Sequence, residues 1–387
     1  MAFSETPWLI GFIMIIITFS VTLIYIIIIR KFKSQVMNNK ELLQYPDLTI
    51  LLPVRNESIV IKQKLKEINE MNYPGIVKLI IIDSLSDDGT LLLVNDFFKH
   101  NKSKMTLKIL KVEKLGKSFA INGALDLIDT DFFVMMDADA ILEQNSLIKI
   151  INNFSNENIG AVSSRLEINA DDSDFPYRKN YNKLRVAESL FDSTPIFEGS
   201  FCAFRTSAVG KYRLNPKINA DDTQLSIIVR KNNFKSIMDS DIVFYEPPSS
   251  DFNDRKRKTR RAQGLIRVLI SNWGLIFKRD KYSFVFLHTF YFHIVMPWLL
   301  LFSLSILSFS SISNILNSQS LQLDIHILTM GVIFLSLSSR TVRIFATGVL
   351  ILLMSQILII TGISLHIWDR DENLRIKSNK MREDSNR

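Results

Sequence analysis

The chain has 387 residues, of which 47% are hydrophobic and 22% are charged. This composition is too apolar for an ordinary soluble enzyme and too charged for a bundle made only of membrane helices, so it indicates a mixed architecture. The single cysteine, Cys202, excludes an internal disulfide framework and a cysteine-ligated zinc site. The net charge is +8, and the basic residues cluster beside apolar segments. This pattern favours a membrane surface or anionic phosphate over nucleic acid as the partner.

The first predicted element is a membrane anchor over residues 1–33. Residues 8–29 form an apolar run of 22 residues, long enough to cross a hydrocarbon core of about 30 Å as a helix. Glu5 precedes the run and a basic cluster at 30–33 follows it, which favours a retained anchor over a cleaved signal peptide. The positive-inside rule then places the following domain in the cytoplasm. A multi-pass protein of the plasma membrane is expected.

A water-soluble domain is predicted over residues 47–250. Its first half contains apolar segments typical of strands, at 48–53, 78–83, 106–112 and 132–136. Helical patterns separate them, ending near residue 71 and covering 88–100 and 118–127. This alternation indicates βαβ units and a mostly parallel sheet, which is an α/β fold. Ligands of such sheets gather beyond the carboxyl ends of the strands, so the polar residues that follow each strand are placed for chemistry.

Two carboxylates follow the fourth predicted strand, at Asp137 and Asp139. Their spacing puts them on one side of an extended chain, with only Ala138 between them. Mg²⁺ and Mn²⁺ are hard cations that bind a few carboxylates together with substrate phosphate oxygens, and this pair fits that requirement. The alternative is a turn whose aspartates cap the following helix.

Four segments occur in a recognisable order, at 52–57, 81–90, 115–124 and 137–139, with the sequences LPVRNE, IIDSLSDDGT, LGKSFAINGA and DAD. In this order and spacing they resemble glycosyltransferase family 2, inverting enzymes of the GT-A fold that include dolichyl-phosphate-mannose, glucosylceramide, hyaluronan and cellulose synthases. The resemblance covers about residues 47–265. The basic and apolar segments that follow also fit membrane-bound members of the family.

The resemblance implies a donor site for a nucleotide sugar, with a UDP-sugar expected first and a GDP-sugar as the other possibility. The residues expected around the nucleoside and the adjoining phosphate are Pro53, Asn56, Glu57, Asp83 and Lys117. Asp83 would accept a hydrogen bond from the base. Asp137 and Asp139 would handle the diphosphate, Asp139 most directly through Mg²⁺ or Mn²⁺. The alternatives are that Asp83 caps a loop and that Lys117 is an ordinary solvated lysine.

A second acidic motif lies at 219–225, NADDTQL. The resemblance implies that Asp222, with Asp221 beside it, is the catalytic base that takes the proton of an acceptor hydroxyl. The alternative is a helix N-cap, and capping and catalysis can coexist in neighbouring aspartates. Gly199 and Ser200 resemble the family's acceptor-side loop. In that loop, glycine permits close approach of the backbone to a substrate. Gly199 could equally serve a tight turn.

Residues 251–283 are predicted to form a basic, amphipathic helix at the membrane interface. The run 255–261 carries six arginines and lysines. Arg260 lies where processive family members carry Gln-x-x-Arg-Trp, and it is expected to stabilise the diphosphate, since guanidinium pairs well with phosphate oxygens. Here the glutamine and tryptophan are replaced, which weighs against polymer extrusion. The alternative is a run that only attracts anionic lipids.

A C-terminal membrane region is predicted over 284–368, with a polar tail at 369–387. Residues 284–310 and 345–368 are each long enough to span a membrane, whereas 325–339 is short. Two or three helices are therefore expected here. The arginines at 340 and 343 favour three, which makes four in the whole chain and places the tail on the side opposite the soluble domain.

The function expected from these features is that of a membrane-bound inverting glycosyltransferase. It would transfer a sugar from a nucleotide-diphosphate sugar to a lipid, lipid-linked or glycan acceptor at the cytoplasmic membrane face. The alternatives are a processive polysaccharide synthase, a nucleotidyltransferase and a non-catalytic nucleotide-binding membrane scaffold. The sequence does not identify the sugar, the base or the acceptor.

Overall fold

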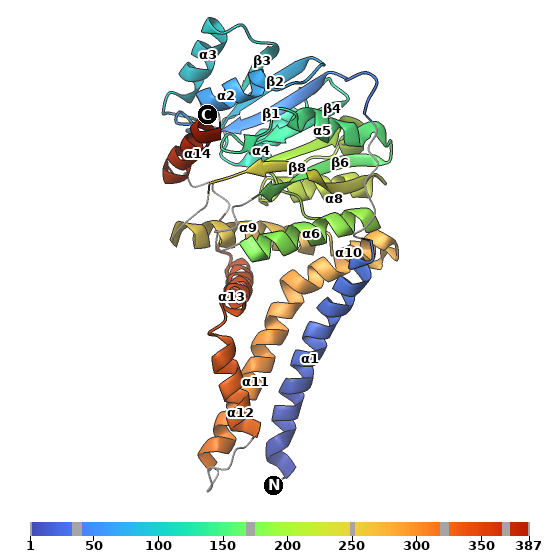
Figure 1. Ribbon diagram of the computed structural model, residues 1–387, viewed down its shortest axis with the longest axis vertical. Coiled ribbons are helices and arrows are strands. Elements are labelled where there is room, and N and C mark those ends of the chain that lie inside the picture. Colours follow the sequence, from blue (N-terminus) through green and yellow to red (C-terminus); the bar gives the residue numbers. More distant parts are fainter. Residues whose placement is uncertain are drawn as a thin grey trace.

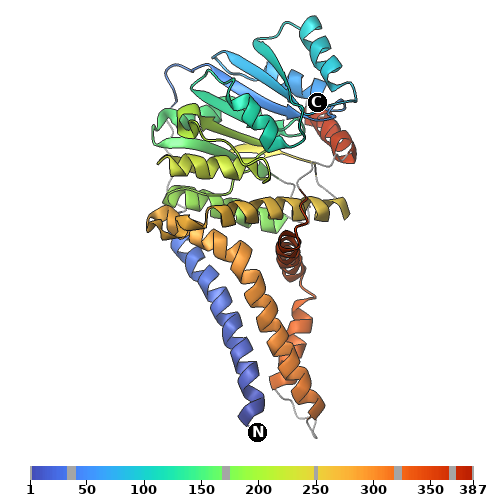
Figure 2. The same cartoon turned by 180° about the vertical axis from the view of Figure 1, so that it is seen from behind.

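The computed structural model describes residues 2–32, 41–167, 175–247, 252–317, 325–365 and 372–385. An α/β domain sits at one end of the molecule, two helices lie beneath it, and long apolar helices extend away from it (Figure 1). Figure 2, from behind, shows the same three levels. The predicted boundaries at residues 33, 250–251 and 369 lie outside the described ranges.

Within the described residues, the domain is built on one eight-stranded sheet in the order β3-β2-β1-β4-β7-β6-β8-β5. The strands are β1 (Leu48–Val54), β2 (Val77–Asp83), β3 (Met105–Lys111), β4 (Phe132–Met136), β5 (Ile141–Leu142), β6 (Ile159–Glu167), β7 (Phe201–Arg205) and β8 (Lys235–Tyr245). The first four strands are parallel, as predicted. Strand β7 runs antiparallel to both β4 and β6, so the sheet is mixed.

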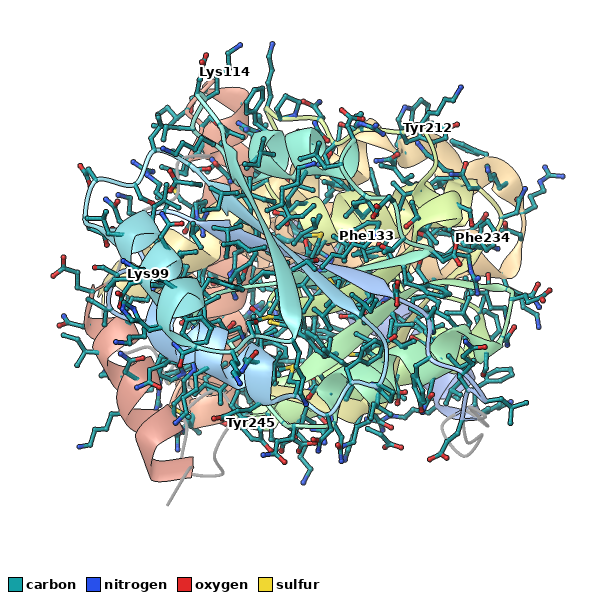
Figure 3. All side chains as sticks on the ribbon, turned by 90° about the horizontal axis from the view of Figure 1, so that it is seen from above. Lys99, Lys114, Phe133, Tyr212, Phe234 and Tyr245 are labelled. Atoms are coloured by element: carbon teal, nitrogen blue, oxygen red, sulfur yellow. The ribbon has the colours of Figure 1, made fainter. Side chains whose placement is uncertain are left out.

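The central strands are buried on both faces, which explains their continuous apolar sequences. Ile50 and Leu52 belong to the core on one face of β1, while Leu51 belongs to the core on the other. On β4, Phe133 stacks on Phe204 of β7 with ring centroids 5.2 Å apart. Figure 3 shows Phe133 at the centre of the domain. The single cysteine, Cys202 on β7, is also fully buried.

Helices cover both faces of this sheet and close the domain toward the apolar region. They are α2 (Ile61–Glu70), α3 (Thr90–His100), α4 (Lys117–Leu125), α5 (Ser146–Asn152), α6 (Phe175–Phe191), α7 (Thr206–Val209), α8 (Asp221–Lys231) and α9 (Phe252–Ser271). Helices α6 and α9 form the layer beneath the sheet in both views (Figures 1 and 2). Helix α9 corresponds to the basic helix predicted within 251–283.

In the described part of the chain, three helical segments are long and apolar enough to cross a membrane: Thr6–Arg30, Lys281–Leu316 and Arg340–Ile360. They comprise α1 (Ala2–Arg30), α10 (Lys281–Phe290) continuing through a π-turn into α11 (Met296–Asn317), and α13 (Arg340–Ile360). Helix α12 (Ile325–Ser336) has 12 residues. At about 1.5 Å per residue it is about 18 Å long, too short to cross a hydrocarbon core of about 30 Å.

Helix α13 differs in direction from the other two long apolar helices. In Figure 1 it is seen end-on, whereas α1 and α11 are seen from the side, so α13 runs across them. Its Ser355 Oγ donates a 3.2 Å hydrogen bond to the carbonyl oxygen of Thr259 on α9. Its Gln356 accepts a 2.9 Å hydrogen bond from the indole of Trp298 on α11. Helix α13 therefore lies beneath the domain and joins α9 to α11.

The C-terminal helix α14 (Glu372–Ser385) packs on the α/β domain (Figure 1). This arrangement corrects the expectation that the polar tail lies on the side opposite the domain. The expectation treated the segment after the arginines at 340 and 343 as a helix that runs alongside the other apolar helices, whereas α13 runs across them. The run of α12 back along α11 and the turn of α13 beneath the domain return the chain to its starting side.

Candidate active site

Sequence-predicted residues meet where β1 and β2 end. Val54 pairs with Asp83 across these parallel strands, so the residues that follow both strands lie side by side. Pro53 is buried within β1. Asp83 has only 5% of its surface exposed, and one of its carboxylate oxygens accepts a 3.3 Å hydrogen bond from the backbone N–H of Ser86.

Asn56 joins the loops after these two strands. Its side-chain amide donates to Asp87 at 2.7 Å, and its side-chain oxygen accepts from the backbone N–H of Asp87 at 2.9 Å. Asn56 has a φ of 55°, in the left-handed region that asparagine tolerates better than most residues. Its side chain therefore braces the loops of the predicted nucleoside site.

Lys117, the first residue of α4, connects the two acidic motifs. Its Nζ lies 2.7 Å from Oδ1 of Asp137 and 3.5 Å from Oδ2 of Asp221. Although burial lowers the pKa of Lys117, the carboxylates of Asp137 and Asp221 raise it well above its ordinary value. The lysine is thus a permanent cation between two segments that lie more than 80 residues apart in the sequence. The alternative of an ordinary solvated lysine is wrong.

Ser200 lies on the other side of Asp137. Its Oγ donates a 2.5 Å hydrogen bond to Glu246 and lies 3.4 Å from Oδ2 of Asp137. Its carbonyl oxygen also accepts a 3.0 Å hydrogen bond from the backbone N–H of Asp137. The predicted acceptor-side loop therefore adjoins the first acidic motif directly, and Glu246 is an acidic neighbour that sequence reasoning missed.

Asp222 lies in the first turn of α8 and is only partly buried. The N-cap residue of α8 is Ala220, but Oδ1 of Asp222 accepts a 2.7 Å hydrogen bond from the backbone N–H of Thr223, so Asp222 also satisfies one N–H group of the first turn. Burial, reinforced by the negative charge of Asp221, raises the pKa of Asp222 to about 7. A carboxylate with this pKa is well matched to general-base chemistry near neutral pH.

Glu57 and Asp139 share one cationic partner, Arg375 of α14. Nε and Nη2 of Arg375 each lie 2.7 Å from an oxygen of Glu57, and Nη1 donates to Asp139. Burial raises the pKa of Glu57 to about 7, although the charge of Arg375 opposes this shift. Sequence reasoning missed Arg375, because the tail has no motif and a mixed charge.

Helix α9 brings its basic residues beneath the acidic motifs. Burial raises the pKa of Asp139, but the charges of Arg375, Arg382 and Arg261 together lower it below its ordinary value. Arg261 is thus an α9 arginine with an electrostatic effect on the site, next to the predicted Arg260. Successive residues of a helix point about 100° apart, so the sequence motif alone did not distinguish the two.

The acidic motif offers oxygen ligands for a divalent cation. The side chains of Asp137 and Asp139 are 18% and 23% exposed. Among the described residues, no group of three or more His, Cys, Asp or Glu side chains is arranged to enclose a metal. This donor set suits Mg²⁺ or Mn²⁺ that completes its coordination with water and substrate phosphate, and it does not suit a metal held by protein ligands alone.

Two family models match the chain. Residues 49–213 match glycosyl transferase family 2, and residues 132–337 match glycosyl transferase family group 2. The second match covers more than half of the chain and extends beyond the α/β domain into the apolar helices.

Curated relatives match over parts of their length. The chain is 25% identical over 187 residues to a poly-beta-1,6-N-acetyl-D-glucosamine synthase of Staphylococcus epidermidis, covering 46% of this chain and 44% of the relative. It is 26% identical over 267 residues to the probable glycosyltransferase YdaM of Bacillus subtilis, covering 66% and 63%. A beta-monoglucosyldiacylglycerol synthase of Nostoc sp. is 31% identical over 124 residues, covering 32% and 26%. The chain thus spans less than two thirds of each relative's length.

A solved structure shares the fold over nearly the whole chain. The mannosyltransferase PcManGT from Pyrobaculum calidifontis, in complex with GDP-Man and Mn²⁺, superposes with a TM-score of 0.77 at 22% sequence identity. The match covers 91% of this chain and 98% of that one.

Proposed function

The chain belongs to glycosyltransferase family 2, and on this premise we propose that it transfers a sugar from a nucleotide-diphosphate sugar to an acceptor with inversion at the anomeric carbon. The observation that carries the proposal is the position of Lys117. It pairs with Asp137 and Asp221 at once, so the base candidate Asp222 lies one residue from the charge network of the diphosphate site.

The acidic residues have separate roles in this reaction. Asp139 and Asp137 would hold Mg²⁺ or Mn²⁺, which supplies Lewis-acid stabilisation of the diphosphate leaving group when bound. Lys117 orients Asp137. Asp222 takes the proton of the acceptor hydroxyl as its oxygen attacks the anomeric carbon, on the face opposite the departing diphosphate. One bond forms and one breaks in a single displacement, so the configuration inverts.

The donor site would be formed by Pro53, Asn56, Glu57 and Asp83, with Arg260 or Arg261 of α9 near the diphosphate. The fold-sharing mannosyltransferase was solved with GDP-Man and Mn²⁺, which supports a nucleotide sugar and a divalent cation as ligands here. We expect a UDP-sugar first, with a GDP-sugar as the second donor class to test.

The acceptor is proposed to be a lipid or lipid-linked glycan at the cytoplasmic membrane face. Gly199 and Ser200 would face it, beside Asp222. Helix α9 lies between the α/β domain and the long helices α1 and α11, where a membrane-resident acceptor would be within reach. The multi-pass topology and the plasma membrane location belong to this proposal.

A second candidate is processive polysaccharide synthesis. The similarity to a poly-beta-1,6-N-acetyl-D-glucosamine synthase favours it. The small number of candidate spans in the described residues and the absence of the Gln-x-x-Arg-Trp motif weigh against it. Product length distinguishes the two, because a single-sugar transferase adds one residue per acceptor.

The test is nucleoside-diphosphate release from a panel of UDP- and GDP-sugars, using membranes that contain wild type or Asp222→Asn. Each donor is assayed with Mn²⁺ and again after chelation. Metal-dependent release by the wild type alone would support the proposal and identify the donor. No release from any donor by folded protein in native lipids would reject it in favour of a binding scaffold.

A further inference from the structure

Helix α14 holds the acidic motif through side chains and backbone. Arg375 binds Glu57 with two parallel 2.7 Å contacts and also donates to Asp139. The side chains of Arg375 and Glu57 are 8% and 2% exposed, so this ion pair is almost completely removed from water. The two residues are separated by 318 positions in the sequence.

The same helix contacts the backbone around Asp139. Ser378 Oγ donates a 2.8 Å hydrogen bond to the carbonyl oxygen of Asp139. Arg382 Nη2 lies 2.8 Å from each of the carbonyl oxygens of Ala138 and Ala140. Thus α14 supplies donors to the carbonyl groups of residues 138–140, and these donors hold the acidic motif in one conformation.

We propose that Arg375 is a positioning residue of the donor site, and that α14 completes this site by fixing the carboxylate and backbone of Asp139 for a divalent cation. The inference rests on the proposed function. Arg375 acts through Glu57 and Asp139, because its Nε, Nη1 and Nη2 are all engaged by these two carboxylates.

The electrostatics favour a structural role for this arginine at the site. A carboxylate as buried as Glu57 is strongly destabilised without a charged partner. Arg375 supplies that partner in the bidentate geometry that a guanidinium allows. Asp139 keeps 23% of its side chain exposed, so its contact with Arg375 leaves surface for a ligand.

The alternative is that Arg375 competes with the cation: it would occupy the position of the cation and would have to leave before the donor binds. Such a residue needs only a contact with Asp139. The hydrogen bonds of Ser378 and Arg382 reach the carbonyl oxygens of the motif, and the fork binds Glu57, so the contacts of α14 extend well beyond the carboxylate that a competitor would cover. They are the contacts expected of a scaffold.

The first measurement is Mn²⁺ binding to the purified full chain in detergent, followed by electron paramagnetic resonance with Mn²⁺ alone and with Mn²⁺ plus UDP or GDP. The variants are Arg375→Gln, Arg375→Lys and the control Lys380→Ala, which removes an exposed lysine of the same helix. We expect at least 10-fold weaker binding for Arg375→Gln, partial recovery for Arg375→Lys because lysine keeps the charge without the fork, and no change for the control. Binding by Arg375→Gln that equals or exceeds that of wild type would overturn the inference.

The second measurement is hydrogen–deuterium exchange of the peptide covering 136–142, in wild type, Arg375→Gln and Arg382→Gln. Both variants should exchange faster than wild type there, whereas their exchange in β2 should be unchanged. Unchanged exchange at 136–142 would overturn the positioning role, whatever the metal data show. A wild type that binds neither Mn²⁺ nor nucleotide would reject the proposed function and the cation role together, and the exchange data would then decide positioning alone.

Discussion

Gly199 lies next to the carboxylate of Asp222: a Cβ placed on Gly199 would lie 3.0 Å from Oδ2 of Asp222 and 3.2 Å from its carboxylate carbon. The glycine therefore leaves the proposed base the space to meet an acceptor. Its φ is not in the left-handed region, so the requirement at this position is space and not backbone conformation.

Gly199→Ala should lower the transfer rate by 10-fold or more, because its methyl group pushes the carboxylate of Asp222 out of position. The stability cost should stay small, since no backbone strain is introduced. Initial rates and thermal unfolding of purified protein measure both effects. The matched control is Gly274→Ala, where a Cβ meets no atom within 4 Å. Equal rates for the two alanine variants would contradict this assignment.

Lys117→Ala should abolish transfer and destabilise the domain by about 1–3 kcal/mol, since it leaves Asp137 and Asp221 without their cation. Denaturant unfolding and donor release are the measurements. Lys99→Ala is the control, because Lys99 lies exposed on α3. A fully active Lys117→Ala protein would show that the lysine does not organise the site.

The rate should rise with pH through about 7, because Asp222 accepts a proton only as a carboxylate and burial with Asp221 raises its pKa to about 7. Asp221→Asn removes a like charge, which lowers the pKa of Asp222 and shifts the acidic limb of the profile to lower pH. The measurement is kcat/KM between pH 5 and 9. An acidic limb that does not move in Asp221→Asn would exclude this electrostatic coupling.

Asp139→Asn and Asp222→Asn should fail in different ways. The first should lose metal-dependent donor binding, whereas the second should bind donor and Mn²⁺ normally and transfer nothing. Donor binding in the presence and absence of chelator, followed by single-turnover assays, separates the two steps. Transfer by either variant at the wild-type rate would refute its assigned role.

The tail and the α/β domain should lie on the same membrane side. Cys202 is buried and is the only cysteine of the chain. A thiol reagent should therefore label only a cysteine that is introduced at an accessible position. Lys380→Cys in α14 and Lys99→Cys in α3 should react with a membrane-impermeant maleimide in the same vesicle orientation. Labelling from opposite faces would contradict the docking of α14.

The sequence by itself determined the strands β1 to β4, the parallel order of the first βαβ units, the long apolar helices and the positions of both acidic motifs. These features depend on local apolar patterns and on residue spacing, and both can be read within a single segment of the sequence. The sequence also placed Asp83 and Asp137 at the ends of strands and Asp222 at the start of a helix, but it did not identify the side chains that pair with them.

Only the tertiary structure decided which charges meet. The pairing of Lys117 with both acidic motifs, the neighbourhood of Gly199 and Asp222, the direction of α13 and the docking of Arg375 on Glu57 all join segments far apart in the chain. No local pattern encodes them, because an arginine in a polar tail has the same sequence signature whether water or a buried carboxylate surrounds it. Burial creates that difference, and burial exists only once the chain has folded.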